Sequence, residues 1–218
     1  MSYKVLSLKY RPQSFSDLAG QDHITRTLVN AFKRDRVSQA YMLTGPRGVG
    51  KTTTARVIAK ALNCSNVKDA APCNSCETCK EIIDGRNLDV LEIDGASNRG
   101  IEEIRNLREQ IKYAPMNAQY KIFIIDEVHM LTNQAFNALL RTLEEPPSHG
   151  KFILATTDIH KVPSTIISRC QRFDFNRINE NVISKHLSKI AEIEKITIDA
   201  ESLQAISIKA DGSMRDAL

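Results

Sequence analysis

The sequence predicts a layered α/β fold with a mostly parallel sheet, followed by a small helical domain. Short apolar runs begin at Ala40, Leu88, Lys121 and Lys151, and none of them alternates cleanly between apolar and polar residues. Such runs are typical of strands that are buried on both faces, as in a parallel sheet. Helical patterns lie between the runs, and strands that alternate with helices indicate a layered α/β fold. After Asn179 only helical patterns follow.

The first half of the chain predicts helix, strand, helix and strand in that order. Ile24, Leu28 and Phe32 recur every four residues and predict a helix with one apolar face. The run AYMLTG, from Ala40, predicts a strand, and the sequence TTTARVIAKALN after it is typical of a helix. The run LDVLEID, from Leu88, predicts the next strand.

The second half continues the alternation and completes a five-stranded sheet. A helix with Ser97 or Asn98 as its N-cap is followed by the strand KIFIIDE. Thr132 is expected to cap a further helix, which stops before Pro146. The runs KFILATT and QRFDFNRI predict the last two strands. The apolar faces of the two helices consist of Ile101, Ile104, Leu107 and Ile111, and of Phe136, Leu139, Leu140 and Leu143.

The change in pattern predicts a domain boundary. Residues 1–178 are expected to form the core, and residues 179–218 a small helical domain with helices over 182–193 and 203–210. The sequence DGS then predicts a turn, after which MRDAL begins another helix. Because the chain ends within that last pattern, we interpret the sequence as a shortened chain.

The composition is that of an ordinary globular protein, with 218 residues, 42% hydrophobic and 26% charged. The formal net charge of +4 permits contact with nucleic acid but does not indicate it. No apolar run approaches the length of a transmembrane helix, and MSYKVLSLKYRPQSF carries charges where a signal peptide is apolar. We therefore expect a cytoplasmic protein with no membrane partner, in which reduced cysteines are better candidates for metal ligands than for disulfides.

The segment GPRGVGKT, residues 45–52, lies between a predicted strand and a predicted helix, as a Walker A phosphate-binding loop does. Its glycines let backbone N–H groups close around phosphate oxygens, and the helix N-terminus adds partial positive charge. Lys51 is expected to reach the β and γ phosphates of ATP, and the Thr52 hydroxyl to bind Mg²⁺. The predicted ATP-binding residues of this segment are Gly45, Pro46, Arg47, Gly48, Val49, Gly50, Lys51, Thr52 and Thr53.

The run IFIIDE supplies a candidate for the second half of the site. It places Asp126 at the C-terminal end of a strand, where parallel α/β sheets hold their ligands. Asp126 is expected to hold Mg²⁺ as a Walker B aspartate, and Glu127 to orient and polarise the attacking water. Taken alone, the pair is better explained as a solvated strand end. The glycine-rich loop earlier in the chain makes the catalytic interpretation the stronger one.

Four cysteines form the pattern C-x8-C-x2-C-x2-C: Cys64, Cys73, Cys76 and Cys79. Four thiolates suit tetrahedral Zn²⁺, and a site without an open position is structural. The alternative is that all four cysteines are free thiols. Free cysteines are usually buried among apolar residues, whereas the neighbours of these four in the sequence are polar, which argues against the alternative. Since the segment is too polar to form its own core, a metal would supply its folding energy. Cys170 has no partner in spacing and is predicted to be a buried thiol.

These motifs resemble those of AAA+ ATPases and, more narrowly, of the bacterial DNA polymerase III gamma/tau subunits, the motor subunits of the sliding-clamp loader. The segments that carry the resemblance run in the family's order along essentially the whole chain: KYRPQSFSDLAGQ, GPRGVGKTTTAR, the cysteine group, IDEVHMLTNQAFNALLRTLEEPP, LATTD, SRCQRF and GSMRDAL. The resemblance implies an AAA+ core with a zinc module at 64–79, a helical lid and a C-terminal collar. Without the collar, we expect a monomer or weak oligomer, whereas the full-length protein would be a hetero-oligomer.

The resemblance also implies roles around the nucleotide. Thr157 fits the sensor 1 position near the γ-phosphate, with Thr156 as the neighbour that could be mistaken for it. Arg215 fits sensor 2, a lid arginine that contacts the γ-phosphate; on residue pattern alone it is an exposed helix arginine. The residues implied to line the adenine pocket are Tyr10, Arg11 and Pro12.

Three further arginines have competing interpretations. Arg169, in SRC, fits an arginine finger that reaches the ATP of an adjacent subunit, and pairing with a local carboxylate such as Asp174 is equally compatible with the sequence. Arg99 and Arg105 are implied to face DNA. Because several glutamates lie nearby, a solvated helix is equally compatible there.

The implied function is an ATPase that loads sliding clamps onto primed DNA, with ATP, Mg²⁺ and Zn²⁺ bound. Its implied partners are other clamp-loader subunits, the sliding clamp, and primed DNA through phosphate contacts. One alternative is a AAA+ helicase or branch-migration motor, which would lack the zinc module. Another is a non-hydrolysing scaffold that binds zinc and nucleotide. The residues that argue against this scaffold are Lys51, Thr52, Asp126 and Glu127.

Overall fold

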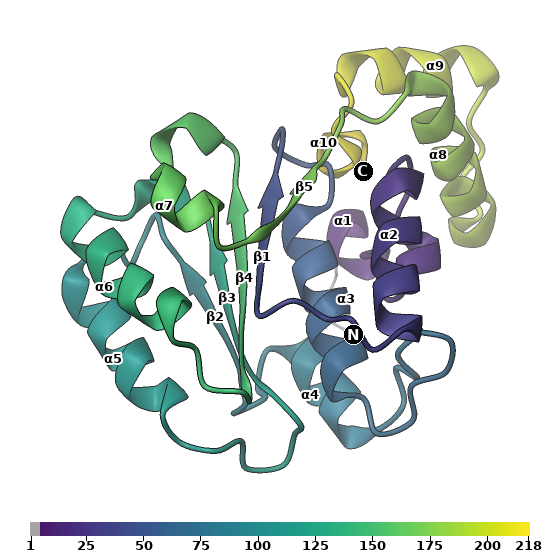
Figure 1. The fold of residues 1–218 in the computed structure, drawn as a ribbon. Helices are drawn as coiled ribbons and strands as arrows, with labels where there is room; N and C mark the ends of the chain where they lie inside the picture. Colours follow the sequence, from purple (N-terminus) through teal and green to yellow (C-terminus); the bar gives the residue numbers. More distant parts are fainter. Residues whose placement is uncertain (1–4) are drawn as a thin grey trace.

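A five-stranded sheet lies between two layers of helices, and a further small group of helices stands beside it (Figure 1). This computed structural model describes residues 5–218. The strands are β1 (Ala40–Thr44), β2 (Val90–Asp94), β3 (Lys121–Asp126), β4 (Gly150–Thr156) and β5 (Gln171–Asp174). Their order is β2-β3-β4-β1-β5, and every neighbouring pair is parallel. The predicted α/β class and five-stranded parallel sheet are confirmed.

The strand register brings the functional motifs to one edge of the sheet. Thr44, at the end of β1, pairs with Thr156 on one side and Asp174 on the other. Asp94 pairs with Asp126 at the ends of β2 and β3. Because all strands are parallel, their C-terminal ends lie together, which is where such sheets hold ligands.

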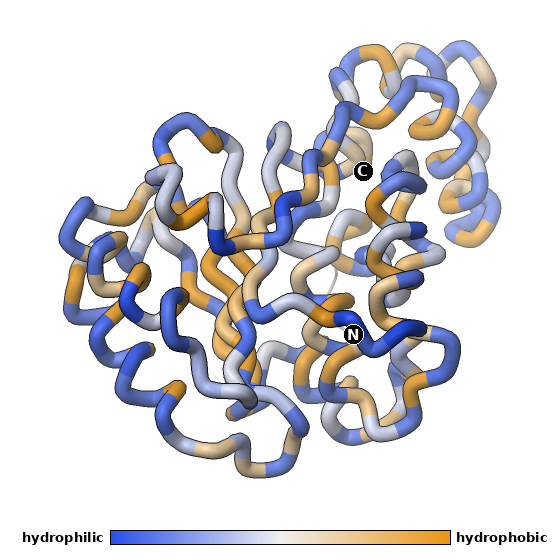
Figure 2. Tube along the Cα trace, in the orientation of Figure 1, coloured by the Kyte–Doolittle hydropathy of each residue, from blue (hydrophilic) through white to orange (hydrophobic). Residues whose placement is uncertain are grey.

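Successive residues of the central strands point to opposite faces, and both faces are buried. In β1, Tyr41 and Leu43 belong to one apolar cluster, whereas Met42 belongs to the other. The hydropathy colouring shows the same apolar centre along the strands (Figure 2). Helices α2 and α3 supply the first cluster, and α5 and α6 the second. These helices are α2 (Asp22–Lys33), α3 (Lys51–Asn63), α5 (Ile101–Ile111) and α6 (Asn133–Glu144).

Two predicted strands are shorter than expected. β2 begins at Val90, and Leu88 is 66% exposed, because this strand is at the sheet edge and is only partly covered. β5 ends at Asp174, and the following Phe175 is buried. Phe175 donates its backbone N–H to the Thr44 carbonyl at 2.7 Å, which keeps the chain close to the phosphate-loop motif.

The helix caps confirm one prediction and correct another. The Thr132 side chain accepts a hydrogen bond from the Ala135 N–H, as expected for the N-cap of α6. The predicted cap of α5 is wrong, since Gly100 occupies that position. Ser97 instead donates to the Asp94 carboxylate at 2.7 Å, in the turn that leaves β2.

The sequence patterns missed two short helices, α1 and α4. The helix α1 (Leu6–Lys9) precedes the sheet, and α4 (Glu77–Asp84) lies within the polar cysteine segment. α4 packs beside α3, and its buried residues are Cys79 and Ile82. Too few apolar residues recur in α4 for periodicity to identify it. A third short helix, α7 (Ser164–Ile167), connects β4 to β5 and agrees with the helical pattern of STIIS before Arg169.

The last three helices have a small apolar cluster of their own. They are α8 (Glu180–Glu194), α9 (Ala200–Lys209) and α10 (Met214–Ala217), and they match the predicted helical patterns. The buried members of the cluster are Ile178, Ile183, Leu187, Leu203 and Ala210. Within residues 5–218, the helices are too short or too polar to cross a bilayer.

Candidate nucleotide site and cysteine cluster

A cavity of about 400 Å³ opens at the C-terminal edge of the sheet. Segments far apart in the sequence line it, among them the N-terminal box at 10–12, the loop at 47–53, the end of β3, and α10 with the end of the chain. The structure therefore brings together most of the residues that the sequence predicted to bind nucleotide. Four predicted residues are not among those that line the cavity: Gly45, Pro46, Thr157 and Arg169.

The glycines of the loop have conformations that other residues rarely adopt. The φ angles are +143° at Gly45, +78° at Gly48 and +103° at Gly50. A Cβ at Gly45 would lie 2.4 Å from the Phe175 carbonyl oxygen, and one at Gly48 would lie 1.9 Å from Ser213 Oγ. These glycines thus allow close packing against the protein's own chain as well as the backbone geometry that phosphate binding needs.

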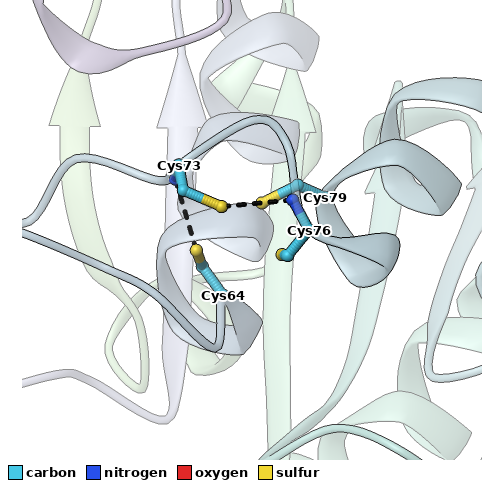
Figure 3. A group of neighbouring side chains, drawn as sticks. All are labelled: Cys64, Cys73, Cys76 and Cys79. Carbon is cyan, nitrogen blue, oxygen red and sulfur yellow. Dashed lines mark hydrogen bonds between the residues drawn. The ribbon is translucent and has the colours of Figure 1, made fainter.

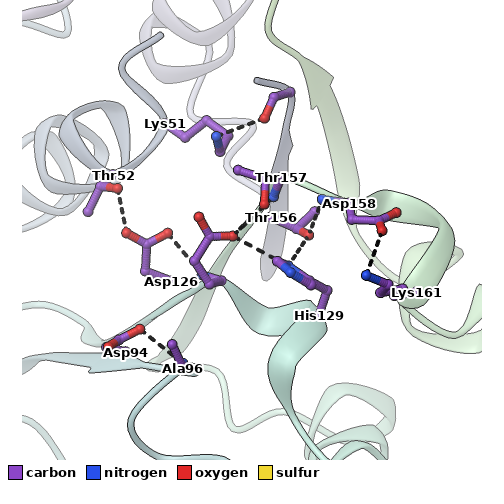
Figure 4. A network of polar contacts seen from close by, with 12 residues as sticks. Lys51, Thr52, Asp94, Ala96, Asp126, His129, Thr156, Thr157, Asp158 and Lys161 are labelled. Carbon is purple, nitrogen blue, oxygen red and sulfur yellow. Dashed lines mark hydrogen bonds and ion pairs between the residues drawn. The ribbon is translucent and has the colours of Figure 1, made fainter. Parts of the chain in front are cut away.

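Lys51 is buried at the start of α3, with 6% of its surface exposed. Its Nζ donates to the carbonyl oxygens of Gly45 at 2.8 Å and Pro46 at 2.6 Å. Burial lowers the pKa of Lys51, and the nearby carboxylates of Glu127 and Asp126 oppose that shift. The ammonium group is therefore held at the loop, with two carboxylates close enough to favour its charged form (Figure 4).

Thr52 and Asp126 meet between α3 and β3. Thr52 Oγ1 donates to Asp126 Oδ2 at 2.5 Å, and Asp126 Oδ1 accepts the Glu127 N–H at 2.9 Å (Figure 4). A hydroxyl and a carboxylate are oxygen donors, which Mg²⁺ prefers, and the metal keeps several waters when only one or two protein groups bind it. The pair fits the predicted magnesium site.

Glu127 is held by the end of β4. Its Oε2 accepts from Thr157 N–H at 3.2 Å and Thr157 Oγ1 at 2.9 Å, and lies 3.3 Å from His129 Nδ1. Thr156 is buried and contacts the same histidine at 3.0 Å. The structure therefore distinguishes the two threonines, because Thr157 contacts the candidate catalytic glutamate directly.

His129 was missed by the sequence reasoning. Its Nδ1 lies between Glu127 Oε2 and Thr156 Oγ1, so it joins the turn after β3 to the end of β4. Its position three residues after Asp126 was a signal, but a single histidine beside a turn has no distinctive spacing.

The N-terminal box and the last helices form the outer wall of the cavity. The Tyr10 hydroxyl donates to the Glu194 carboxylate, which joins the box to α8. Arg215 lines the cavity, and its backbone N–H donates to the Gly48 carbonyl at 3.4 Å. His186 of α8 also lines it and was not predicted; burial lowers the pKa of this histidine.

Arg169 lies after α7 and is tied to local groups. Its Nη2 is 2.8 Å from Glu144 Oε1, and its Nη1 donates to the Thr165 carbonyl at 2.7 Å. The local carboxylate is thus Glu144. Asp174, which the sequence suggested as the alternative partner, pairs with Arg172.

The four cysteines of the motif converge (Figure 3). Their sulfur atoms all lie within 4.8 Å of one another, and sulfurs bound about 2.3 Å from one tetrahedral zinc would be roughly 3.8 Å apart. Hydrogen bonds from Ser75, and from the Cys76 N–H, lower the pKa of Cys73 to about 5, which favours a thiolate. The donor set fits a closed, structural zinc site. The cluster consists of Cys64, Cys73, Cys76 and Cys79.

Cys170 lies outside this cluster, as predicted. It is partly buried rather than fully buried, since it packs at the margin of the second apolar cluster. Burial raises the pKa of its thiol to about 12, so it stays protonated near neutral pH.

Two family models match the chain. The model for "DNA polymerase III, delta subunit" matches residues 20–179. The model for "DNA polymerase III clamp loader subunit, ATPase lid domain" matches residues 182–218. The first model covers the part that contains the sheet, and the second covers the last three helices.

Curated relatives match along the whole chain. It is 54% identical over 218 residues to DNA polymerase III subunit tau of Bacillus subtilis, covering 100% of this chain and 39% of that protein. It is 50% identical to subunit gamma of Buchnera aphidicola subsp. Acyrthosiphon pisum, and the match covers 100% of this chain and 60% of that protein. It is 47% identical to subunit tau of Escherichia coli, and that match covers 100% of this chain and 34% of that protein. The chain thus spans less than two thirds of each relative.

Among solved structures, the chain is similar to the RuvB Holliday junction branch migration motor of Thermotoga maritima. The TM-score is 0.68 at 18% identity, and the match covers 95% of this chain and 62% of the RuvB chain. At that identity the likeness shows a shared fold and does not indicate a shared substrate.

Proposed function

Because the chain belongs to the DNA polymerase III gamma/tau family of clamp-loader subunits, we propose that it binds and hydrolyses ATP to load a sliding clamp onto primed DNA. The observation that carries this proposal is the single cavity lined by the loop at 47–53, Asp126, Glu127 and Arg215. A site that joins the sheet edge to the last helices lets nucleotide binding change the position of those helices. Chromosome replication is the process that such a clamp serves, and we expect it in the cytoplasm.

Each group around the cavity has a proposed part in ATP binding. Backbone N–H groups of the loop hold the phosphates, and Lys51 exchanges the Gly45 and Pro46 carbonyl oxygens for phosphate oxygens. Thr52 and Asp126 would hold Mg²⁺, which neutralises phosphate charge and orients the triphosphate when bound. Tyr10 and its neighbours bind the adenine, and Arg215 contacts the γ-phosphate.

Glu127 is the proposed group that acts on the attacking water. In the structure its carboxylate accepts two hydrogen bonds from Thr157, so its position depends on the end of β4. We propose that Thr157 exchanges this contact for the γ-phosphate or the water, which frees Glu127 to take a proton as the water attacks. The expected partners are other subunits of the DNA polymerase III complex, the clamp and primed DNA.

We propose that the chain has two domains, a core at 1–178 and a helical lid at 179–218. The zinc module at 64–79 is inserted in the core. The separate apolar cluster of α8, α9 and α10 supports this division.

The function is tested by measuring ATP hydrolysis by the full-length protein with its partner subunits. A clamp loader is expected to hydrolyse faster when clamp and primed DNA are both present than with either alone. A branch-migration motor, the alternative with which this chain shares a fold, would be stimulated by branched DNA without the clamp. Stimulation of that second kind would contradict the proposal.

A structural zinc at the cysteine cluster is our first specific prediction. Elemental analysis should find about one zinc per chain, and Cys73→Ser should lower that content strongly, because one of four ligands is lost. Cys170→Ser is the matched control and should leave it unchanged. Chelation should expose residues 64–79 to protease while the sheet stays folded. Protein without metal, with four freely reactive thiols and the same protease resistance, would refute the zinc site.

DNA contact through Arg99 and Arg105 is our second prediction. Both side chains are exposed, with Arg99 in the segment between β2 and α5 and Arg105 on α5, where it pairs with Glu102 at 2.6 Å. Exposed pairs of this kind contribute little, so phosphate can displace the glutamate. Replacing both arginines by Ala should lower DNA-stimulated ATPase activity and reduce the slope of log affinity against log salt by about 2. Arg86→Ala, an exposed control paired with Asp84, should change neither. An unchanged salt slope in the double variant would favour the solvated helix.

A further inference from the structure

Lys60 is a buried cation that the proposed ATPase mechanism does not use. It lies on α3, nine residues after Lys51, and only 1% of its surface is exposed. Its Nζ donates to three oxygens at 2.7 Å each: the Gln13 carbonyl, the Gln13 side-chain Oε1 and Asn74 Oδ1. An ammonium group has three protons, so these acceptors use all of its donors. A buried charge of this kind is sensitive to the loss of any partner.

One of the three acceptors belongs to the cysteine cluster. Asn74 lies between Cys73 and Cys76 and has a φ of +55°, a conformation that asparagine tolerates better than most residues. The Cys76 N–H donates to Cys73 Sγ at 3.3 Å across the same turn. The position of Asn74 Oδ1 therefore depends on the turn that brings these two cysteines together.

The other two acceptors belong to Gln13, which is joined to the wall of the nucleotide cavity. Gln13 follows the box residues Arg11 and Pro12, both of which line the cavity. Its side-chain amide donates to the Arg11 carbonyl at 2.9 Å, while its Oε1 accepts from Lys60. Lys60 thus holds the backbone of the N-terminal box at 10–12 in place through its hydrogen bonds to the main chain and the side chain of Gln13.

A single helix connects all of these parts. α3 begins at Lys51 beside the phosphate loop and ends at Asn63, with Cys64 as its C-cap. Its 13 residues span about 20 Å. Lys60 lies in its last turns, where it contacts the box on one side and the cysteine turn on the other.

We propose that Lys60 couples the cysteine cluster to the nucleotide cavity, so that zinc binding and ATP binding strengthen each other. This inference rests on the zinc and ATP sites of the proposed function. When no zinc holds the cysteine turn, Asn74 moves away from Lys60, and the buried ammonium group loses one of its three acceptors. Gln13 must then shift to supply the missing hydrogen bond. Because Gln13 is bonded to the Arg11 carbonyl, this shift displaces Arg11 at the cavity wall. Coupling between two binding sites is reciprocal, so ATP must also favour retention of zinc.

The test is an equilibrium titration of the full-length protein with the fluorescent analogue mant-ATP, with and without zinc. Zinc is removed by a zinc-selective chelator at constant free Mg²⁺, and its content is measured by elemental analysis. The wild-type protein should bind mant-ATP about tenfold more weakly without zinc, the effect expected from one lost charged hydrogen bond. Lys60→Met, which keeps the length of the side chain, should bind with the same affinity in both states.

Lys80→Met is the matched control, because Lys80 is an exposed lysine of α4 beside the cysteine cluster. It should keep the tenfold response to zinc. Asn74→Gly is a second variant, since glycine accepts the positive φ but offers no side-chain acceptor. It should also lose the response, and it carries the test if Lys60→Met does not fold.

The outcomes separate this inference from the proposals on which it rests. Protein that never contains zinc would refute the zinc site, and protein that does not bind mant-ATP would refute the proposed function; either result also overturns the coupling. If the protein binds both zinc and mant-ATP, but its affinity for mant-ATP is the same with and without zinc, the coupling is overturned while the two sites stand. A tenfold response that persists in both Lys60→Met and Asn74→Gly would show that the coupling does not pass through Lys60.

Discussion

Replacing Lys51 by Ala is expected to weaken ATP binding by at least about 100-fold, since charged hydrogen bonds to several phosphate oxygens are lost together. The structure holds the Lys51 ammonium group at the phosphate loop, buried and donating to two loop carbonyls. Removing it leaves those carbonyls without a donor and the phosphates without a neutralising charge. Equilibrium titration with ATP measures the loss. Lys209→Ala, at an exposed site on α9, is the control and should bind normally.

Glu127→Gln is expected to behave differently. The amide keeps the size of the side chain and one oxygen that can accept from Thr157, so ATP binding should be retained. Without a carboxylate to take a proton from water, hydrolysis should fall about 10²- to 10⁴-fold. Single-turnover hydrolysis measures this step apart from binding. If Glu127→Gln lost ATP as severely as Lys51→Ala, the proposed division of roles would be wrong.

Arg169→Ala is expected to reduce hydrolysis about 10³- to 10⁵-fold in the site of the adjacent subunit, while ATP still binds in the variant's own site. Arg169 is not among the residues that line its own cavity, which supports action on a neighbour. Its guanidinium offers a fixed charge and a planar fork to the γ-phosphoryl group as charge develops. The pair with Glu144 is partly exposed, with 35% and 44% of the side chains accessible. Such pairs contribute about 0–1 kcal/mol, so releasing the arginine costs little.

A mixing experiment locates the defect. Assemblies that contain Arg169→Ala in one subunit should lose hydrolysis in the site that this subunit faces, and assemblies with Arg172→Ala should not. Arg172 is a suitable control because it is a nearby arginine that pairs with Asp174. In a verified monomer, Arg169→Ala should leave ATP binding unchanged. Loss of ATP binding in that monomer would mean that the residue acts within its own subunit or supports the fold.

The sheet and its functional edge were predictable because the signals are local and repeated. Apolar runs of strand length predicted β1, β3 and β4, and the order strand, glycine-rich loop and helix predicted the conformation of residues 45–52. Thr132 was predictable as a cap because its side chain bonds within one turn. The proximity of Thr52 and Asp126 was also predictable, since both motifs follow strands whose ends meet in a parallel sheet.

Contacts between distant segments were not predictable. Nothing in the local sequence places Ser213 against Gly48, yet this contact brings α10 to the cavity. The partner of Arg169 was misjudged for the same reason, because Glu144 lies on another helix and Asp174 is nearer in sequence. Lys60 showed no signal, since a lysine within a helical pattern usually lies at the surface. Its three acceptor atoms belong to Gln13 and Asn74, which only the folded chain brings together.

We propose that the core and the last helices bind ATP together in one cavity. Hydrogen exchange of the protein, measured with and without a non-hydrolysable ATP analogue and Mg²⁺, reports on both parts at once. Residues 10–13, 45–52 and 213–215 are all expected to gain protection when the analogue binds, and Lys51→Ala should abolish protection in all three segments. Protection confined to 45–52, with no change at 10–13 or 213–215, would show that the last helices take no part in binding ATP.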